Sequence, residues 1–254
     1  MRKSVFITGA AQGIGLEIAR RFAASNCFVG LYDINESGLS ALERSGEFSD
    51  ACFGSIDVTD KNSVSAALEH FSTRSGGQLH VLINNAGVLS GGAFHEISPE
   101  AHQMMIDVNV AGLTRVAQLA FPYLKATPDS VMVNLCSLSS VHGIPGLAVY
   151  SSSKFYVDGL TQALSLEWEP FDIRVSCVKP PVVNTSMGHA AASTLAGQGD
   201  PSMEADDVAL AVERAASGRR VSYLLGMQGK IWSRLDKWLP EALARGLARR
   251  LTSG

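Results

Sequence analysis

Tyr150 and Lys154 have the residue types and the spacing to do acid–base chemistry. Residues four positions apart lie on one face of a helix, so a helix over this segment would place the phenol beside the ammonium. A tyrosine phenol has a pKa of about 10, and a neighbouring ammonium stabilises the phenolate and lowers that pKa toward neutrality. Such a phenol can donate a proton to a developing alkoxide or accept one from an alcohol. Two polar residues on an ordinary helix face are the alternative.

A glycine-rich turn, Thr8-Gly9-Ala10-Ala11-Gln12-Gly13-Ile14-Gly15, follows the first apolar run of the chain. Glycine permits a positive φ and a close approach of the backbone to a ligand. A pyrophosphate in this turn would meet unpaired N–H groups and the positive end of a helix dipole, while Gly15 would let that helix pack against the sheet. An ordinary close-packed turn is the alternative. The residues expected to bind a cofactor here are Gly9, Gln12, Gly13, Ile14 and Gly15.

Asp33 ends the second apolar run, 24 residues after Gly9. This is close to the interval of about 20 residues at which a carboxylate reaches the adenosine ribose hydroxyls of a dinucleotide. The carboxylate would repel a 2′-phosphate, and neither Ala11 nor Gln12 supplies a cation to bind one. The pattern therefore predicts NAD(H) rather than NADP(H). A helix cap, provided by Asp33 or Asn35, is the alternative.

Seven short apolar runs rich in β-branched residues are available to position these groups. They cover residues 5–8, 27–32, 51–56, 79–83, 131–135, 173–178 and 221–225. Apolar residues at helical spacing lie between them, such as Ile14, Ile18 and Phe22. The alternation predicts parallel strands joined by right-handed crossovers, and hence a doubly wound α/β (Rossmann) sheet of about seven strands.

The length of 254 residues suits one compact domain. We assign residues 1–228 to a dinucleotide-binding and catalytic domain and residues 229–254 to a basic amphipathic extension of two short helices, broken at Pro240 and packed on that domain. Residues 219–254 carry eight Lys or Arg against two Asp or Glu, a local charge of +6 in a chain of net charge −3. Docking of the extension on an anionic membrane surface is an alternative that we favour less than packing.

Three motifs in order give the chain a specific resemblance. They are the glycine-rich turn, the segment Asn84-Asn85-Ala86-Gly87, and Tyr150-x3-Lys154 preceded by Ser137. Together they resemble the short-chain dehydrogenase/reductase family over roughly residues 3–226, and such an ordered set is far more specific than a glycine fingerprint alone. Within this set Tyr150 and Lys154 are predicted to be catalytic. The resemblance implies an oxidoreductase that moves a hydride between NAD(H) and a secondary alcohol or ketone.

The resemblance also implies roles for residues beyond the first turn. It places Asp57 and Val58 at the adenine, Asn85, Ala86 and Gly87 beside the cofactor, and Pro180, Val183 and Thr185 near the nicotinamide, with Tyr150 and Lys154 touching the cofactor as well. It assigns Asn109 to the proton path and Ser137 to the orientation of the substrate oxygen. Ser139 and Ser140 compete with Ser137 for that role, and a helix cap is the alternative for Asp57.

Two departures from the family pattern stand out. Pro181 occupies a position where the family commonly has glycine, and proline fixes φ and removes an N–H beside the expected nicotinamide. The C-terminal segment lacks the glycine-rich ending with which many tetrameric members build an interface. A homodimer through the helices that carry Asn109 and Tyr150 is therefore expected more firmly than a tetramer.

Other classes of protein are disfavoured by composition and spacing. Serine hydrolysis would require a G-x-S-x-G elbow, which the residues around Ser137 do not form. The four cysteines and six histidines show no ligand spacing, so we expect no metal. The chain as a whole has no basic footprint for nucleic acid, and the apolar run after Met1 is too short for a signal peptide, which predicts a cytoplasmic protein.

The ligand of the site stays open at this stage. We expect a small-molecule alcohol or ketone, with a lipophilic one as an option, whose identity depends on residues 142–147, on residues 186–202 and on the extension. The composition of residues 186–202, rich in small residues, predicts a mobile loop. An NAD(H)-binding sensor or scaffold without turnover is the alternative function, and the intact Asn109–Ser137–Tyr150–Lys154 set argues against it.

Overall fold

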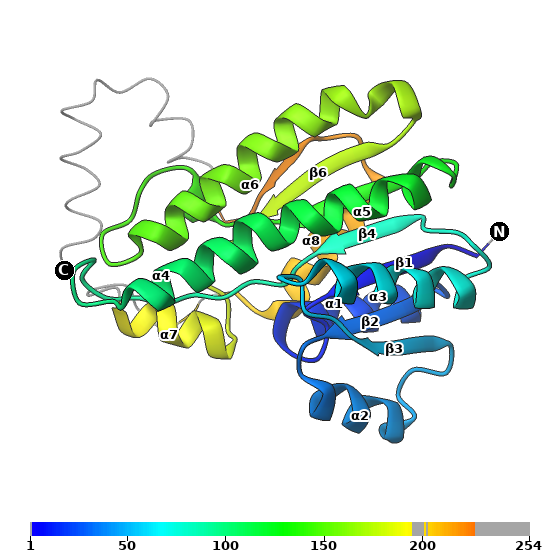
Figure 1. Cartoon of the computed structure of the whole chain (residues 1–254), viewed down its shortest axis with the longest axis horizontal. Helices are drawn as coiled ribbons and strands as arrows, with labels where there is room; N and C mark the ends of the chain where they lie inside the picture. Colours follow the sequence, from blue (N-terminus) through cyan, green and yellow to red (C-terminus); the bar gives the residue numbers. More distant parts are fainter. Residues whose placement is uncertain (1, 195–200, 202, 227–254) are drawn as a thin grey trace.

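A single parallel sheet organises the chain in the computed structural model, which describes residues 2–194, 201 and 203–226. Within these residues seven strands pair in the order β3-β2-β1-β4-β5-β6-β7 (Figure 1). The strands are β1 (Ser4–Thr8), β2 (Phe28–Asp33), β3 (Ala51–Ser55), β4 (Val81–Asn84), β5 (Val131–Leu135), β6 (Arg174–Lys179) and β7 (Ser222–Leu224). The doubly wound sheet predicted from the sequence is confirmed.

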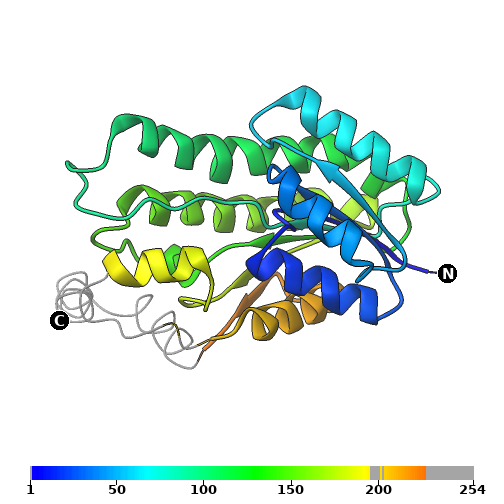
Figure 2. The same cartoon turned by 90° about the horizontal axis from the view of Figure 1, so that it is seen from below.

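Helices connect the strands and cover both faces of the sheet, as Figure 2 shows from below. The helices are α1 (Gly13–Ala24), α2 (Glu36–Ser45), α3 (Lys61–Arg74), α4 (Pro99–Ile106), α5 (Leu113–Lys125), α6 (Ala148–Glu167), α7 (Ser186–Thr194) and α8 (Ala205–Ser217). Shorter helical turns are η1 (Asp107–Gly112), η2 (Leu138–Ser140) and η3 (Glu169–Phe171). Helices α1 and α8 pack on one face, and α3, α5 and α6 on the other.

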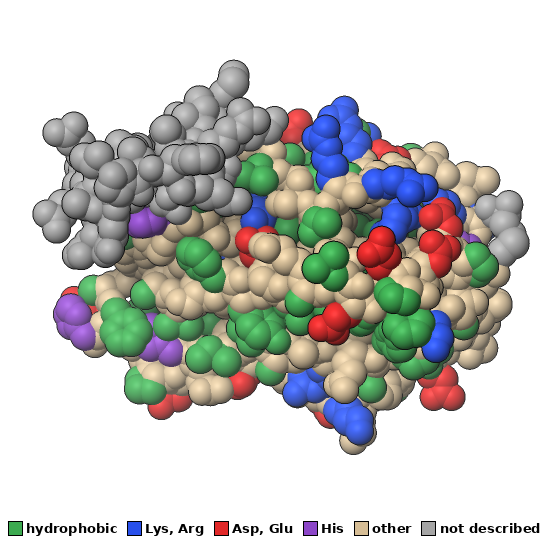
Figure 3. All heavy atoms as spheres, turned by 90° about the horizontal axis from the view of Figure 1, so that it is seen from above, with side chains coloured by type: hydrophobic (Ala, Val, Ile, Leu, Met, Phe, Trp, Pro, Cys, Tyr) green, Lys and Arg blue, Asp and Glu red, His purple; other side chains and the backbone are tan. Residues whose placement is uncertain are grey.

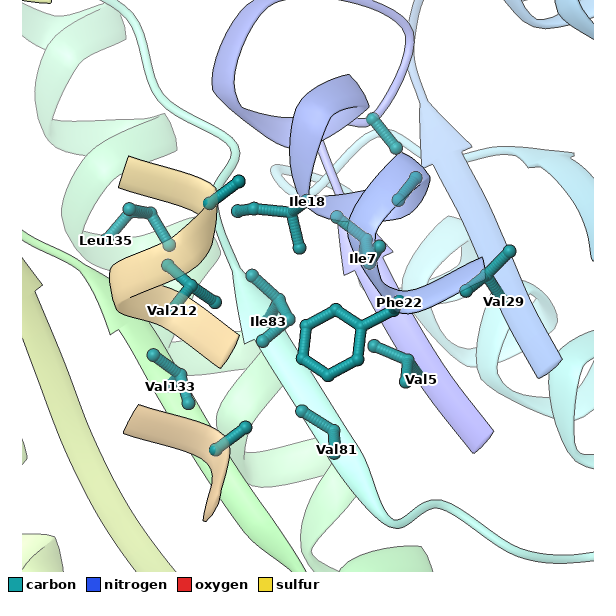
Figure 4. Packing of buried hydrophobic residues seen from close by; sticks show 14 of the residues in the cluster. Val5, Ile7, Ile18, Phe22, Val29, Val81, Ile83, Val133, Leu135 and Val212 are labelled. Atoms are coloured by element: carbon teal, nitrogen blue, oxygen red, sulfur yellow. The ribbon is translucent and has the colours of Figure 1, made fainter. Parts of the chain in front are cut away.

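The strands read as continuous apolar runs because both faces are covered. Successive side chains of β1 illustrate this: Val5 and Ile7 belong to the cluster under α1 and α8, whereas Phe6 packs under α3. On α1, Ile18 and Phe22 recur on the inner face and meet the strands beneath (Figure 4). The apolar residues at helical spacing in the sequence thus form a buried stripe on α1.

The segment after β6 differs from its sequence prediction. Residues 186–194 form helix α7, so the predicted loop over 186–202 is wrong for this part. The Thr185 hydroxyl accepts a hydrogen bond from the Gly188 N–H (3.1 Å) at the start of this helix, and an alanine run follows, which is a strong helix former. Residues 195–200 and 202 lie outside the described residues. So do residues 227–254, and the predicted helical extension and its packing therefore remain predictions.

The topology brings the predicted site residues to one edge. Strand β1 pairs with β2 on one side and β4 on the other, which is the point where the strand order reverses. Ligands of doubly wound sheets bind outside the carboxyl ends of the strands at such a switch point. Asp33 ends β2, and the glycine-rich turn, Asn85 and Ser137 lie at the carboxyl ends of β1, β4 and β5. In the described part of the chain, no helix is both long enough and apolar enough to cross a membrane.

Core packing makes a first prediction. Ile18 on α1 is fully buried, and Ile18→Ala should lower the free energy of unfolding by about 2–5 kcal/mol because it removes apolar contacts and leaves a cavity. The matched change Ile34→Ala, at a residue that is 68% exposed, should stay within about 0.5 kcal/mol of wild type. Urea unfolding measures both. Equal effects of the two variants would contradict the assignment of α1 to the core.

Candidate active site and nucleotide-binding edge

The glycine-rich turn has the backbone geometry expected of a phosphate cradle. Gly9 and Gly13 adopt φ values of 67° and 56°, in the left-handed region that favours glycine. A Cβ on Gly15 would lie 2.0 Å from the Gly9 carbonyl oxygen and 2.6 Å from Asn85 Nδ2. Helix α1 begins at Gly13, and the side chain of its N-cap residue, Gln12, makes no capping hydrogen bond. The N–H groups in the first turn of α1 are therefore not capped by Gln12 and can bind an anion.

Asn85 and Thr8 fix this turn to the neighbouring strand. The Asn85 side-chain amide donates to the carbonyls of Thr8 and Gly9, both at 2.9 Å. The Thr8 hydroxyl accepts from the N–H groups of Asn85 (3.1 Å) and Ala86 (3.0 Å). Thr8 was not among the predicted site residues, although its place between a buried strand and Gly9 is a signal that could have identified it.

Asp33 faces the turn rather than capping the next helix. Its Oδ2 accepts from the Ala11 N–H and its Oδ1 from the Asn35 N–H, each at 2.9 Å. The cap of α2 is Asn35, whose side chain accepts from the Gly38 N–H at 3.0 Å. The carboxylate is therefore held, half-buried, beside the glycine-rich turn.

Asp57 and Val58 follow β3 at the same edge. Asp57 Oδ1 accepts from the Thr59 N–H (2.8 Å) and hydroxyl (2.7 Å), while Asp60 caps α3. The Val58 carbonyl accepts from Arg115 Nη1 at 2.6 Å, and a Cβ on Gly112 would lie 2.7 Å from Val58 Cγ2. The helix-cap alternative for Asp57 therefore does not apply to α3, and the segment is braced against the start of α5.

Tyr150 and Lys154 lie on α6 with the Lys154 Nζ atom 5.5 Å from the centroid of the phenol ring. Lys154 is buried, and its ammonium donates to the Leu135 carbonyl at 3.0 Å. Burial lowers the pKa of Lys154, because the charged form loses its hydration. Burial likewise raises the pKa of Tyr150 to about 12, against the lowering effect of a hydrogen bond with Ser137. The phenol pKa is thus raised, not lowered as the sequence predicted, because desolvation dominates.

Ser137, two residues after the end of β5, is the serine that contacts Tyr150. Its Oγ donates to Ser139 Oγ and accepts from the Ser139 N–H, both at 3.1 Å. Ser140 instead donates its hydroxyl proton to the Ser137 carbonyl at 2.8 Å, and both Ser139 and Ser140 are buried. Among the three candidates, Ser137 is the half-buried one beside the phenol.

Asn109 occupies a π-helical turn, η1, between α4 and α5. Its side chain accepts from the Val88 N–H (2.8 Å) and donates to the Val88 carbonyl (2.9 Å) and to Ser153 Oγ (3.2 Å). The Ser153 hydroxyl donates to the Tyr150 carbonyl at 2.7 Å. A Cβ on Gly87 would lie 3.3 Å from Asn109 Oδ1 and 3.8 Å from Lys154 Nζ, so these residues converge.

The segment after β6 crosses to the glycine-rich turn despite Pro181. The Pro180 carbonyl accepts from the Leu138 N–H at 2.9 Å, and Val183 is buried in a bridge to Met203. A Cβ on Gly13 would lie 3.4 Å from Thr185 Cγ2. Thr185 therefore stands beside the turn in which a pyrophosphate would lie. Among the described residues, no group of three or more His, Cys, Asp or Glu is placed to hold a metal ion.

Comparison with known proteins identifies the family. The model of the short chain dehydrogenase family matches residues 3–196. The sheet order, the glycine-rich turn and the convergence of Ser137, Tyr150 and Lys154 agree with that match. The chain belongs to the short-chain dehydrogenase/reductase family. It is accordingly an oxidoreductase whose fold binds a nicotinamide dinucleotide.

Individual relatives span most of the chain. Oxidoreductase UcpA of Escherichia coli strain K12 is 32% identical over 222 residues, which cover 87% of this chain and 82% of the relative. A 3-oxoacyl-[acyl-carrier-protein] reductase FabG of Chlamydia muridarum is 31% identical over 74% of this chain and 76% of its own length. The crystal structure of 3-ketoacyl-(acyl-carrier-protein) reductase from Brucella melitensis complexed with NADH aligns with a TM-score of 0.78 at 26% identity, covering 88% of this chain and 96% of that chain.

The closeness of Gly15 to the turn makes a second prediction. Gly15→Ala should weaken binding of NADH, or of NADPH if wild type prefers it, at least about tenfold, because the new methyl group displaces the Gly9 carbonyl. Fluorescence titration of the reduced cofactor measures the dissociation constant. Gly159→Ala is the matched control, since a Cβ there meets nothing within 4 Å and should leave binding unchanged. Wild-type affinity in Gly15→Ala would show that the turn does not cradle the cofactor.

Proposed function

We propose that this protein transfers a hydride reversibly between NAD(H) and a secondary alcohol or ketone, with Tyr150 as the acid–base residue. The observation that carries the proposal is the convergence of Ser137, Tyr150 and Lys154 beside the carboxyl end of β5. The bound cofactor supplies the hydride chemistry. The residues of the chain then have to bind the substrate oxygen and exchange one proton with it.

Each residue of the set has a task that its contacts support. Tyr150 gives its phenolic proton to the oxygen of a ketone or takes the proton of an alcohol. Ser137, hydrogen-bonded to the phenol, holds the substrate oxygen at the same place. Lys154 holds the cofactor and favours the phenolate through its positive charge, and the positive nicotinamide of NAD⁺ acts in the same direction. Asn109 supports the proton path through its hydrogen bond to Ser153, which reaches the backbone of Tyr150.

Asp33 supports NAD(H) as the preferred cofactor. Two backbone N–H groups hold its carboxylate beside the turn, where the adenosine ribose would lie. A fixed negative charge there accepts hydrogen bonds from two ribose hydroxyls and repels a 2′-phosphate. Asp57 and Val58 would line the adenine, and Pro180, Val183 and Thr185 the nicotinamide end, beside the small residues Ala86 and Gly87.

The assembly and the location of the protein are also proposed. We propose a cytoplasmic homodimer formed through η1, α5 and α6. Helix α6 exposes three large apolar or aromatic side chains, Phe155, Tyr156 and Leu166. Figure 3 views this side of the molecule, where hydrophobic side chains are spread over the surface. A small-molecule alcohol or ketone is the proposed ligand and nucleic acid is not a proposed partner, while membrane contact through the C-terminal extension stays the less favoured alternative.

The acid–base role makes a third prediction. Tyr150→Phe should lower kcat for ketone reduction by about 10²–10⁴-fold and leave NADH binding close to wild type, because the ring remains and the proton is lost. NADH oxidation against a panel of aliphatic, aromatic, steroid and β-keto substrates measures turnover. Tyr156→Phe, on the same helix and 39% exposed, is the matched control and should stay fully active.

Two other outcomes of this experiment would contradict parts of the proposal. Turnover that survives Tyr150→Phe would remove the proposed acid–base residue. NADH binding by wild type without turnover of any substrate in the panel would favour either a substrate outside the panel or a sensor or scaffold.

The cofactor preference makes a fourth prediction. Asp33→Asn keeps the size of the side chain and removes its charge, so the preference for NADH over NADPH should narrow by about 10–100-fold. The ratio of kcat/KM for the two cofactors measures the preference. Asp60→Asn, which retains a good cap on α3, should leave the ratio unchanged. A wild type that prefers NADPH would show that Asp33 does not select the cofactor.

A further inference from the structure

An ion pair between a buried lysine and a half-buried aspartate lies close to the proposed site and has no task in the proposed chemistry. Lys179 Nζ stands 2.7 Å from Asp158 Oδ1, and the two side chains are 8% and 18% exposed. Removing two charges from water costs free energy that their mutual attraction often does not recover. Stability alone is therefore a weak reason for such a pair to be present at this place.

The position of the pair relates it to Lys154. Tyr150, Lys154 and Asp158 lie at intervals of four on α6, so they share one face in consecutive turns. Lys179 is the last residue of β6 and directly precedes the segment that reaches the glycine-rich turn. The Lys154 ammonium is bonded to the Leu135 carbonyl at 3.0 Å, whereas Asp158 is bonded to Lys179.

Asp158 would otherwise be a natural partner of Lys154. Carboxylate and ammonium groups four residues apart on a helix attract each other, less strongly in this order, with the lysine first, than in the reverse order, and the attraction grows as water is excluded. An ammonium drawn one turn down the helix would no longer stand beside the phenol ring. Lys179 reaches the same carboxylate from the strand and neutralises it.

Other titratable groups packed around α6 do not take this role. From the sheet, Cys136 Sγ contacts the Lys154 carbonyl (3.3 Å) and Cys177 Sγ contacts Asp158 Oδ1 (3.8 Å). Asp107 of η1 accepts from Gln103 Nε2 at 2.8 Å. The remaining charged or titratable groups on the elements that pack against α6 are Glu100 and His102 of α4, Glu169 of η3 and Arg174 at the far end of β6. Asp158 is the carboxylate one turn from Lys154.

We propose that Lys179 is a positioning residue that keeps the Asp158 carboxylate away from Lys154, so that the Lys154 ammonium stays available to the cofactor and to Tyr150. The same ion pair ties α6 to the end of β6, and hence the helix of Tyr150 to the segment that contains Thr185. This inference rests on the role of Lys154 in the proposed function. The inference adds Lys179 to the proposed site, a residue that none of the three sequence motifs includes.

The experiment uses the pH dependence of cofactor binding to report the charge on Lys154. The dissociation constant of NADH, or of NADPH if wild type prefers it, is measured between neutral and alkaline pH for wild type, Lys179→Met, Asp158→Asn and the double variant. Binding that uses the Lys154 ammonium weakens as the pH rises through the pKa of that group. The midpoint of this loss is the readout, and it requires no turnover.

The two single variants should move this midpoint in opposite directions. Lys179→Met leaves a negative charge one turn from Lys154, which should move the midpoint up by about one pH unit and weaken binding at neutral pH about tenfold as the ammonium turns toward Asp158. Asp158→Asn leaves a positive charge nearby and should move the midpoint down by about one pH unit. The double variant has neither charge and should return the midpoint to the wild-type value.

Controls separate this role from a purely structural one. Lys179→Arg keeps the charge and should keep the wild-type midpoint. Glu47→Gln removes the negative charge of the exposed Arg20–Glu47 pair (2.6 Å), the same change of charge as in Asp158→Asn, and should leave the midpoint unmoved. Thermal unfolding of every variant confirms that the proteins compared are folded.

Single variants that bind more weakly with an unmoved midpoint, or midpoints that move in the same direction, would overturn the inference. The result is distinguishable from failure of the proposed function. A wild type that binds the cofactor, shows the opposite shifts and reduces no ketone refutes the proposed reaction alone. A wild type that reduces ketones while both single variants keep its midpoint refutes the positioning role alone.

Discussion

The close contact among Gly9, Gly15 and Asn85 is the constraint on which the site depends. Helix α1 can approach the end of β1 because Gly15 has no Cβ, which would otherwise stand 2.0 Å from the Gly9 carbonyl. The Asn85 side-chain amide donates hydrogen bonds to two carbonyls of the turn, and the Thr8 hydroxyl accepts hydrogen bonds from the two backbone N–H groups that directly follow β4. The two strands at the switch point thus end in one rigid unit. Gly87, three residues after β4, lies against Asn109 and Lys154 and so connects this unit to the residues of the proposed active site.

Burial acts in opposite directions on the two ionisable groups of the proposed site. It raises the pKa of Tyr150 to about 12 and lowers the pKa of Lys154, because the charged form of each loses hydration. A phenol with a raised pKa is protonated at neutral pH, which suits donation to a ketone oxygen. Removal of a proton from an alcohol requires added positive charge near the ring, and NAD⁺ carries that charge whereas NADH does not. The phenol of the polypeptide alone is therefore protonated at neutral pH.

The sequence was sufficient for the parts of the molecule that depend on local pattern. Continuous apolar runs predicted the seven strands to within about two residues at each end, and the Tyr150–Lys154 spacing predicted their shared helix face. Contacts between distant segments could not be predicted in this way. The π-helical turn that holds Asn109, the Thr8–Asn85 bonds and the Asp158–Lys179 pair each depend on how packed elements meet. Helix α7 was missed because small residues suit a loop as well as a helix, and only the contacts of Thr185 with its first turn distinguish them.

The same reasoning explains why the substrate does not follow from the motifs. The last residue of α7, Thr194, packs against two glycines, since a Cβ on Gly91 would lie 2.4 Å from its Oγ1 and a Cβ on Gly146 would lie 3.2 Å from its Cγ2. Gly92 in turn donates its N–H to the Gly146 carbonyl at 2.9 Å. The segments after β4 and after η2 therefore meet α7 through backbone and a single small side chain. The proposed hydride and proton transfer needs none of these contacts, so the proposed chemistry and the packing around α7 depend on different residues.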